Sequence, residues 1–294
     1  MFSYRHAFHA GNHADVLKHT VLIAALEHLL EKETPLTVVD THAGAGLYRL
    51  DGDYAGTSGE AADGVLRLLP ETAPKPDEPA LADALARYLA VVRDFNPKGG
   101  ARIYPGSPFI IHHLLRDHDK LKLFELHPTD ARTLGANIAQ LEAGRRVAVL
   151  PEDGFGSATK FLPPPSRRAL VLCDPSYEMK TDYAKVVAGV REALTRFADA
   201  VVIVWYPQIL TLESSQLAHR LQGAADSLGK RGWLHVRLSA QQPDERGFGL
   251  VGSGLFIVNP PFSLHDNLNA VMPYLVDTLG QYDGANYLLE QRSV

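Results

Sequence analysis

Short, mainly apolar runs recur along the chain, and four of them are followed within three residues by a carboxylate. These runs lie at 36–39, 121–124, 147–150 and 170–173. The carboxylates that follow them are Asp40, Glu125, Asp153 and Asp174. The run at 170–173 has no polar alternation, which is typical of a strand buried on both faces of a parallel sheet. The pattern therefore predicts an α/β fold whose strands end in a row of acidic side chains.

The later part of the chain alternates between helical and extended patterns. We expect helices near 182–196 and 213–228, on either side of a strand at 200–205. Two further strands are expected at 233–239 and 253–258. Strands that alternate with helices of this length are typical of a doubly wound sheet. We therefore predict a Rossmann-like architecture.

An unusually long stretch separates the first two strand ends. In a nucleotide-binding sheet the acidic residue follows the glycine loop by about 20 residues, whereas Glu125 lies nearly 80 residues beyond Gly46. An insertion at 51–103 explains the excess, with helical patterns at 58–69 and 78–95 and four prolines between them. The predicted divisions are an N-terminal block with the first strand (1–50), an inserted helical subdomain (51–103) and the remainder of the core (104–294).

The richest candidate chemistry lies where the run at 170–173 stops at Asp174, Pro175, Ser176 and Tyr177. Proline ends the strand because it has no N–H to donate. The Asp174 carboxylate and the Pro175 carbonyl can accept the two hydrogens of an amine such as adenine N6, while Tyr177 stacks on an extruded base. These contacts aim the nitrogen lone pair at an electrophile. The tetrapeptide therefore indicates N-methylation, although strand-ending Asp-Pro pairs also start ordinary turns.

A glycine pair follows the first strand. Gly44 and Gly46 let the backbone turn tightly and approach a nucleoside. The third glycine of the dinucleotide fingerprint is absent, because Arg49 stands there. The loop therefore fits S-adenosylmethionine better than a dinucleotide. At the next strand ends, Glu125 can accept both ribose hydroxyls and Asp153 can accept from the adenine amino group of the cofactor.

Composition indicates an intracellular enzyme. The chain has 294 residues, 46% of them hydrophobic, which is enough for a large core. Its one cysteine, Cys173, lies inside a predicted strand and is best explained as a packing residue. We find no apolar stretch of membrane-spanning length and no signal-peptide pattern, and therefore expect a cytoplasmic protein. Four of the 13 histidines lie near the N-terminus without a cysteine to complete a ligand set, so we expect no metal.

The net charge of −5 argues mildly against nucleic-acid binding, which needs Lys and Arg. Net charge is not the local field, however. We expect one basic rim from residues near the strand ends, namely Arg5, Lys18, Arg167, Arg168, Lys180 and Arg246. For Arg167 and Arg168, a solvated turn before a strand explains the pair equally well. The charge balance favours a small, shaped RNA element over a long basic track.

Six longer segments resemble a family of bacterial enzymes that methylate adenine N6 in 23S ribosomal RNA. The segments are 4–19, 40–46, 104–108, 125–128, 153–155 and 177–183, and the resemblance runs along nearly the whole chain. It implies a class I S-adenosylmethionine-dependent methyltransferase sheet that is parallel except for its last strand. It also implies 23S ribosomal RNA as the substrate. Separately, we expect a monomer.

The same resemblance assigns roles to further residues. We expect the N-terminal block to form a lid whose helix is capped by Asn12 or Asp15, so that Lys18 and His19 reach the cofactor. The resemblance strengthens this role for Lys18 and His19, and a substrate role for Tyr4. Tyr4 and His6 would contact the target nucleotide. The full expected cofactor set is Lys18, His19, His42, Gly44, Gly46, Ser107, Glu125, Asp153 and Gly154. The expected catalytic set is Asp174, Pro175 and Tyr177.

The expected reaction is direct in-line methyl transfer to N6 of the flipped adenine, accelerated mainly by alignment of the two reactants. One residue departs from the family pattern, because Ser176 stands where proline is usual. None of the expected contacts uses that side chain. We therefore expect only some loss of backbone stiffness and a modest effect on rate.

A second tetrapeptide, Asn259 to Phe262, looks even more like the general amino-methyltransferase motif. In the resembled fold the strand before it is inserted antiparallel, so its carboxyl end lies at the edge opposite the cofactor. We interpret it as structural. Three alternative functions remain open: methylation of adenine N6 in another nucleic acid, RNA binding without catalysis, and NAD-dependent oxidation.

Overall fold

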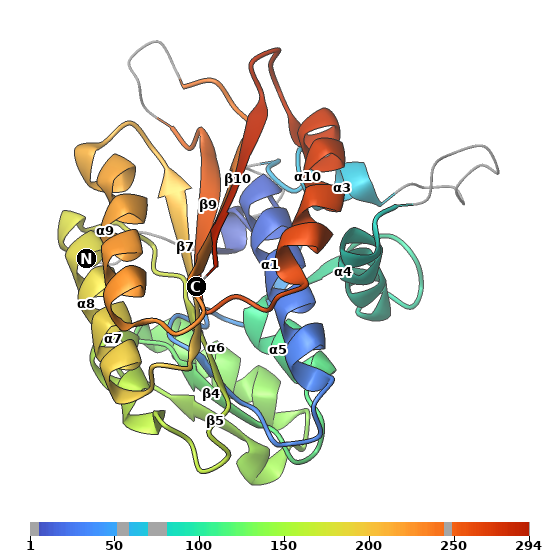
Figure 1. Ribbon diagram of the computed structural model, residues 1–294. Coiled ribbons are helices and arrows are strands. Elements are labelled where there is room, and N and C mark those ends of the chain that lie inside the picture. Colours follow the sequence, from blue (N-terminus) through green and yellow to red (C-terminus); the bar gives the residue numbers. More distant parts are fainter. Residues whose placement is uncertain (1–5, 52–58, 70–80, 244–248, 294) are drawn as a thin grey trace.

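A computed structural model of the chain describes residues 6–51, 59–69, 81–243 and 249–293. Its centre is an eight-stranded sheet with the order β10-β8-β9-β7-β6-β1-β4-β5 (Figure 1). Five neighbouring strands are parallel: β5 (Val147–Leu150), β4 (Lys120–Phe124), β1 (Thr37–Asp40), β6 (Ala169–Cys173) and β7 (Val201–Gln208). The predicted parallel α/β sheet is confirmed.

The other three strands form an antiparallel extension. Strand β9 (Gly252–Val258) pairs antiparallel with both β7 and β8 (Trp233–Ser239), as the resemblance implied. Strand β10 (Asn286–Arg292) adds an edge strand on β8 that we did not predict. Its residues are mostly exposed and carry no continuous apolar run, so the sequence lacks the signal that marks the inner strands.

Helices cover both faces of the sheet (Figure 1). One face carries α1 (His13–Leu30), α5 (Ser107–Leu114), α6 (Pro128–Ala139) and α10 (Leu264–Leu279). The other face carries α7 (Gly154–Ser157), α8 (Lys180–Arg196) and α9 (Leu212–Leu228). Short 3-10 turns lie at His6–Phe8, Gly144–Arg146 and Ala158–Phe161. No described helix is both long and apolar enough to span a membrane.

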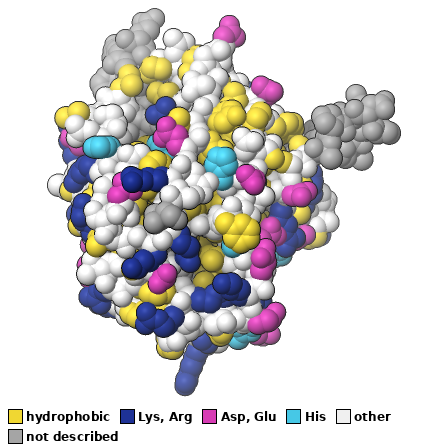
Figure 2. Space-filling model, in the orientation of Figure 1, with side chains coloured by type: hydrophobic (Ala, Val, Ile, Leu, Met, Phe, Trp, Pro, Cys, Tyr) yellow, Lys and Arg dark blue, Asp and Glu magenta, His cyan; other side chains and the backbone are white. Residues whose placement is uncertain are grey.

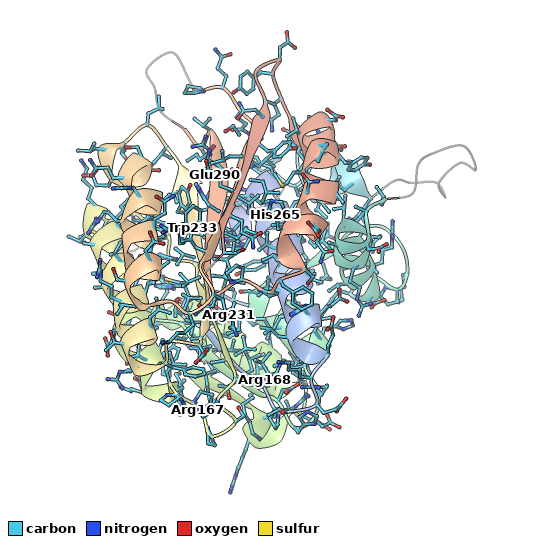
Figure 3. The ribbon with its side chains drawn as sticks, viewed as in Figure 1. Arg167, Arg168, Arg231, Trp233, His265 and Glu290 are labelled. Carbon is cyan, nitrogen blue, oxygen red and sulfur yellow. The ribbon has the colours of Figure 1, made fainter. Side chains whose placement is uncertain are left out.

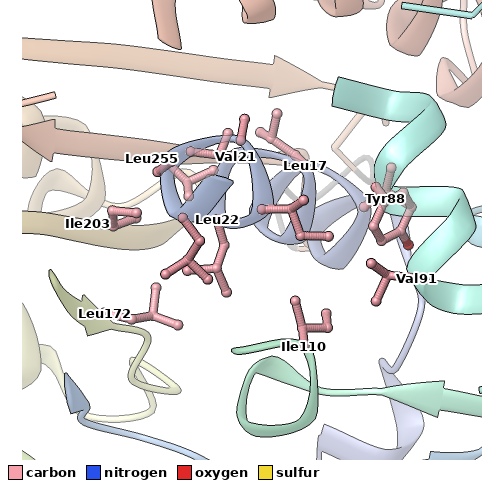
Figure 4. Packing of buried hydrophobic residues seen from close by; sticks show 14 of the residues in the cluster. Leu17, Val21, Leu22, Tyr88, Val91, Ile110, Leu172, Ile203 and Leu255 are labelled. Carbon is pink, nitrogen blue, oxygen red and sulfur yellow. The ribbon is translucent and has the colours of Figure 1, made fainter. Parts of the chain in front are cut away.

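Helix α1 is the central helix of the fold. Every residue from His13 to Leu26 is buried, so the helix has no solvent-facing stripe. In Figure 4, Leu17, Val21 and Leu22 lie between the strand residues on one side and Tyr88 on the other. The expected lid is therefore wrong for this helix, which is a core element whose first turn reaches the site. Asn12 caps it, accepting from the Asp15 N–H at 3.0 Å, as predicted.

The predicted insertion contributes α3 (Val65–Leu68) and α4 (Asp83–Asp94), which pack against α1 and α10. The first helix is much shorter than the 58–69 pattern indicated, and 52–58 and 70–80 lie outside the described residues. The ends of the insertion meet in a small antiparallel pair, β2 (Leu47–Arg49) with β3 (Ile103–Pro105), which we did not predict. The domain boundaries themselves stay a prediction.

Candidate active site

A cavity of about 690 Å³ opens at the carboxyl ends of β1, β4, β5 and β6. The predicted site residues that line it are His6, Lys18, His19, His42, Gly44, Ser107, Glu125, Asp153, Gly154, Asp174, Pro175 and Tyr177. Tyr4 lies outside the described residues. Parallel strands place their carboxyl ends together, which is why residues as far apart in the sequence as His42 and Tyr177 share one cavity.

Gly46 is not among the lining residues. A Cβ on this residue would lie 2.8 Å from Phe109 and 2.9 Å from Leu134, at a positive φ of 84°. The backbone carbonyl of Gly46 accepts the Gly106 N–H at 2.8 Å. Packing of the loop against α5 and α6 accounts for this glycine in the structure.

Asp174 is held by a lysine at the start of α1. The Lys18 Nζ donates to Asp174 Oδ2 at 2.7 Å and lies 2.7 Å from Asp15 Oδ1. Burial alone lowers the pKa of Lys18, but the two carboxylates outweigh burial and raise it. Lys18 is therefore a fixed cation between two acids.

The carboxyl groups on either side of Lys18 differ in their surroundings. Burial raises the pKa of Asp174, against the lowering effect of Lys18. Burial also disfavours the Asp15 anion, but His6 and Lys18 hold the pKa of Asp15 well below its usual range. His6 lies 3.0 Å from Asp15 Oδ2, which also accepts the Gly11 N–H at 2.9 Å. Asp174 is thus the better proton acceptor of the two.

Tyr177 adopts a left-handed backbone conformation, with φ at 54°. Its hydroxyl donates to the Trp205 carbonyl at 2.7 Å, and its ring centroid lies 4.6 Å from that of Tyr183. A bulky residue at positive φ is uncommon and is found where tertiary contacts impose it. The ring is largely buried, at 7% exposure, but forms part of the cavity wall. The neighbouring Ser176 is exposed.

The glycine loop is fastened to the next strand end. The Glu125 carboxylate accepts the Gly44 N–H at 2.8 Å and the His127 N–H at 2.7 Å. Burial raises the pKa of Glu125, an effect that these two N–H groups oppose. Both carboxylate oxygens keep a second lone pair, so the group can still accept hydroxyl donors.

His42, Asp153 and Gly154 form the adjoining wall. Burial lowers the pKa of His42 to about 3, so this ring is neutral, and it packs edge-on against Phe155 at 4.6 Å. Asp153 caps α7 by accepting the Phe155 N–H at 3.0 Å. A Cβ on Gly154 would lie 2.0 Å from the Thr41 carbonyl oxygen, so close backbone packing requires this glycine.

Ser107 connects the cavity to a buried acid that our site prediction did not include. Its hydroxyl donates to Asp40 Oδ2 at 2.7 Å, and Asp40 is fully buried. Burial raises the pKa of Asp40 to about 7, against the lowering effect of the Ser107 hydrogen bond. The place of Asp40 among the four strand-end carboxylates was the signal that could have identified it.

Among the described residues, Arg167 and Arg168 do not join the expected basic rim, whereas Lys18 lines the cavity. Arg167 and Arg168 precede β6, so they lie at the amino edge of the sheet, opposite the cavity. Figures 2 and 3 show this side of the molecule, where Lys and Arg gather over the lower half and Arg167, Arg168 and Arg231 are labelled. Arg168 donates to the carbonyls of Leu29 and Thr34. Arg5 and Arg246 lie outside the described residues.

The polar groups that line the cavity suit a nucleoside with a cationic centre. Glu125 and Asp153 present acceptors, and Asp130 adds another carboxylate to the lining. His19 Nδ1 is bonded to the Tyr104 hydroxyl at 2.7 Å, while its buried Nε2 has no partner among the described residues. Burial lowers the pKa of His19 to about 3, so this ring is neutral. The described residues include no group of three or more His, Cys, Asp or Glu side chains that could hold a metal.

Comparisons with known proteins give one consistent result. The family model described as "Ribosomal RNA large subunit methyltransferase D, RlmJ" matches residues 33–289. "Ribosomal RNA large subunit methyltransferase J" of Escherichia coli (strain K12) is 44% identical over 275 residues, 94% of this chain and 93% of the relative. The Haemophilus influenzae protein of the same name is 39% identical over 280 residues, 95% and 94% of the two chains. A crystal structure of a Legionella pneumophila protein matches with a TM-score of 0.82 at 29% identity, covering 96% of this chain and 98% of that one.

Proposed function

The chain belongs to the ribosomal RNA large subunit methyltransferase J family, and on that premise we propose that it transfers a methyl group from S-adenosylmethionine to N6 of an adenine in 23S ribosomal RNA. The observation that carries the proposal is that Asp174, Pro175 and Tyr177 line the same cavity as Glu125 and Gly44. A base-binding tetrapeptide and a nucleoside-binding loop thereby share one space of about 690 Å³. We place this activity in the bacterial cytoplasm and expect a monomer.

The residues present fit the cofactor. Glu125 would accept the ribose hydroxyls, and Asp153 the adenine amino group. His19 Nε2 and Lys18 lie where the block at the start of α1 enters the cavity. When bound, S-adenosylmethionine supplies an electrophilic methyl group on a sulfonium.

The chain's own residues orient the nucleophile. The Asp174 carboxylate and the Pro175 carbonyl accept the two N6 hydrogens, and the Tyr177 ring packs against the extruded base. Lys18 restrains the Asp174 side chain through a hydrogen bond with an Nζ–Oδ2 distance of 2.7 Å. Because burial raises the pKa of Asp174, this carboxylate takes the departing N6 proton more readily than an ordinary aspartate. Alignment of the reactants supplies much of the remaining acceleration.

The test is incubation of the purified protein with methyl-labelled S-adenosylmethionine and unmodified 23S ribosomal RNA, with genomic DNA in parallel, followed by digestion to nucleosides. Labelled N6-methyladenosine from the RNA alone is the expected result. Label in the DNA instead would redirect the proposal to another nucleic acid. No label together with RNA binding would favour a non-catalytic relative, and oxidation of reduced nicotinamide would favour a dehydrogenase.

A further inference from the structure

Three of the most exposed apolar side chains lie together beside the cavity. Met179, Leu210 and Leu212 are 60%, 66% and 67% exposed. They flank the starts of α8 and α9, which an ion pair between Lys180 Nζ and Glu213 Oε1 at 3.4 Å holds together. Below, we call these three residues the apolar rim.

The apolar rim is continuous with the cavity. Met179 and Ile209, the neighbour of Leu210, line the cavity directly. The same stretch of wall carries Tyr177, whose ring we assign to the extruded base. Met179 and Ile209 therefore connect the base pocket to the exposed side chains of Leu210 and Leu212.

Packing among the described residues does not account for the apolar rim. Helices α8 and α9 cover the sheet through other residues, including Val186, Val190 and Leu217, which are at most 2% exposed. None of the three rim residues belongs to the described hydrophobic clusters or packs against them. An exposed apolar group beside a binding site marks an interaction surface.

The cations near the apolar rim indicate its partner. The side chains of Lys180 and Lys185 are 79% and 48% exposed, and Lys185 also lines the cavity. Lys180 pairs with Glu213, and Lys185 Nζ lies 3.1 Å from Asp182 Oδ1, so both ammonium groups are exposed at the ends of ion pairs. Apolar side chains with ammonium groups beside them match nucleic acid, which offers base faces and phosphates together.

We propose that the apolar rim packs against the bases that flank the target adenine and replaces the stacking lost when that base is extruded. This inference rests on the proposed function. It adds that, before the RNA binds, the target adenine is stacked between neighbouring bases. Apolar side chains that enter a base step favour the unstacked state in this way. Leu210 and Leu212 then act on base extrusion, while Asp174 acts on the extruded base.

The test compares the double variant L210A/L212A with wild type on two RNAs. The first is the 23S fragment that accepts the methyl group; the second is the same fragment with the nucleotide opposite the target adenine deleted, so that the adenine is already unpaired. We expect kcat/KM to fall about tenfold on the first RNA and less than about threefold on the second, because extrusion costs less there. An equal loss on both RNAs, or no loss on either, would overturn the proposal.

A second readout needs no methyl transfer. With 2-aminopurine at the target position, binding of the wild-type protein should raise fluorescence as the base unstacks, and L210A/L212A should give a smaller rise at saturation. The matched control is F262A, which removes an 81% exposed side chain at the opposite edge of the sheet and should behave as wild type. A fluorescence rise in L210A/L212A equal to that of wild type would contradict the proposed role of the apolar rim. Absence of methylation by the wild type would instead contradict the proposed function.

Discussion

Two tetrapeptides of similar sequence lie at opposite edges of this sheet. Asp174 to Tyr177 follows β6, and Asn259 to Phe262 follows β9. Both strands are fully buried, and each tetrapeptide contains one non-glycine residue at positive φ, 54° for Tyr177 and 55° for Asn259. Strand direction separates them, because β9 runs antiparallel to β7 whereas β6 runs parallel to it.

The two edges use similar residues for different purposes. The Asn259 side chain accepts the N–H groups of Lys230 and Arg231 at 2.8 Å and donates to the carbonyls of Ala198 and Ala200. It is fully buried and connects two loops at the amino edge. Asp174 instead faces a cavity and keeps accepting capacity for a ligand. A tetrapeptide of this type is therefore informative only together with the direction of its strand.

The largest expected effect comes from Asp174→Ala. Loss of the carboxylate removes one of two acceptors for N6, so we expect methyl transfer to fall by about a thousandfold or more. Calorimetric titration should show that S-adenosylmethionine binding is retained. Substantial residual activity would mean that the catalytic role has been assigned to the wrong one of the two tetrapeptides.

Asn259→Ala should damage folding and leave the chemistry intact. Four backbone groups lose their partner, and alanine tolerates the positive φ poorly, so we expect unfolding free energy to drop by about 3 kcal/mol. Urea denaturation measures this loss, while kcat per folded molecule should stay within about twofold of wild type. A large fall in kcat without loss of stability would give this edge a catalytic role.

The buried acid Asp40 should make the folding stability of the protein depend on pH. Its folded pKa of about 7 exceeds that of an ordinary aspartate, so the native state holds more protons than the unfolded chain between about pH 4 and 7. Stability attributable to this group is therefore lost as pH rises through that window. Asp40→Asn should remove this pH dependence. The unfolding free energy of the variant, relative to that of wild type, should therefore rise by about 2 kcal/mol between pH 5 and 8.

Denaturation curves across that range test this sign. The loss caused by Asn259→Ala serves as the control, because an amide does not titrate and its deficit should be independent of pH. A difference between Asp40→Asn and wild type that is constant with pH would show that Asp40 is ionised throughout.

The smallest expected effect is that of Ser176→Pro, which restores the usual family residue. Ser176 is exposed, and its side chain makes none of the proposed contacts. We expect kcat to change by less than about threefold, with a slight gain in thermal stability from reduced backbone freedom. A tenfold rise in kcat would show that the serine limits the catalytic geometry.

The sequence predicted the elements that carry strong local patterns. The inner strands, α8, α9 and the pair β8 and β9 lie within a few residues of the predicted ranges, because their apolar runs or helical spacing are unambiguous. Helix α1 was harder to place, since burial on all sides leaves no amphipathic stripe to show what covers it. Strand β10 has little apolar content and depends on β8 for its hydrogen bonds.

Contacts between residues far apart in the chain could not be predicted from the sequence. Lys18 was assigned to the cofactor, and its position beside Asp174, 156 residues away, depends on how α1 packs on the sheet. The bond from Ser107 to Asp40 likewise requires α5 to cover β1. Strand direction, by contrast, could be predicted from the resemblance. It alone indicated that Asp174 to Tyr177, and not Asn259 to Phe262, lies at the site.

The pairing of β2 with β3 closes the insertion at one point. Leu47 and Pro105 are direct partners, so the chain leaves the core and returns to it at the same place. The inserted segment is nevertheless built into the core, because Tyr88 and Leu89 of α4 are fully buried in the same cluster as α1. A Cβ at Gly64 would lie 2.1 Å from the Gly11 carbonyl oxygen, so the segment also packs closely against the turn before α1. A chimera that exchanges this segment must therefore supply both the apolar face of α4 and the close contact at position 64.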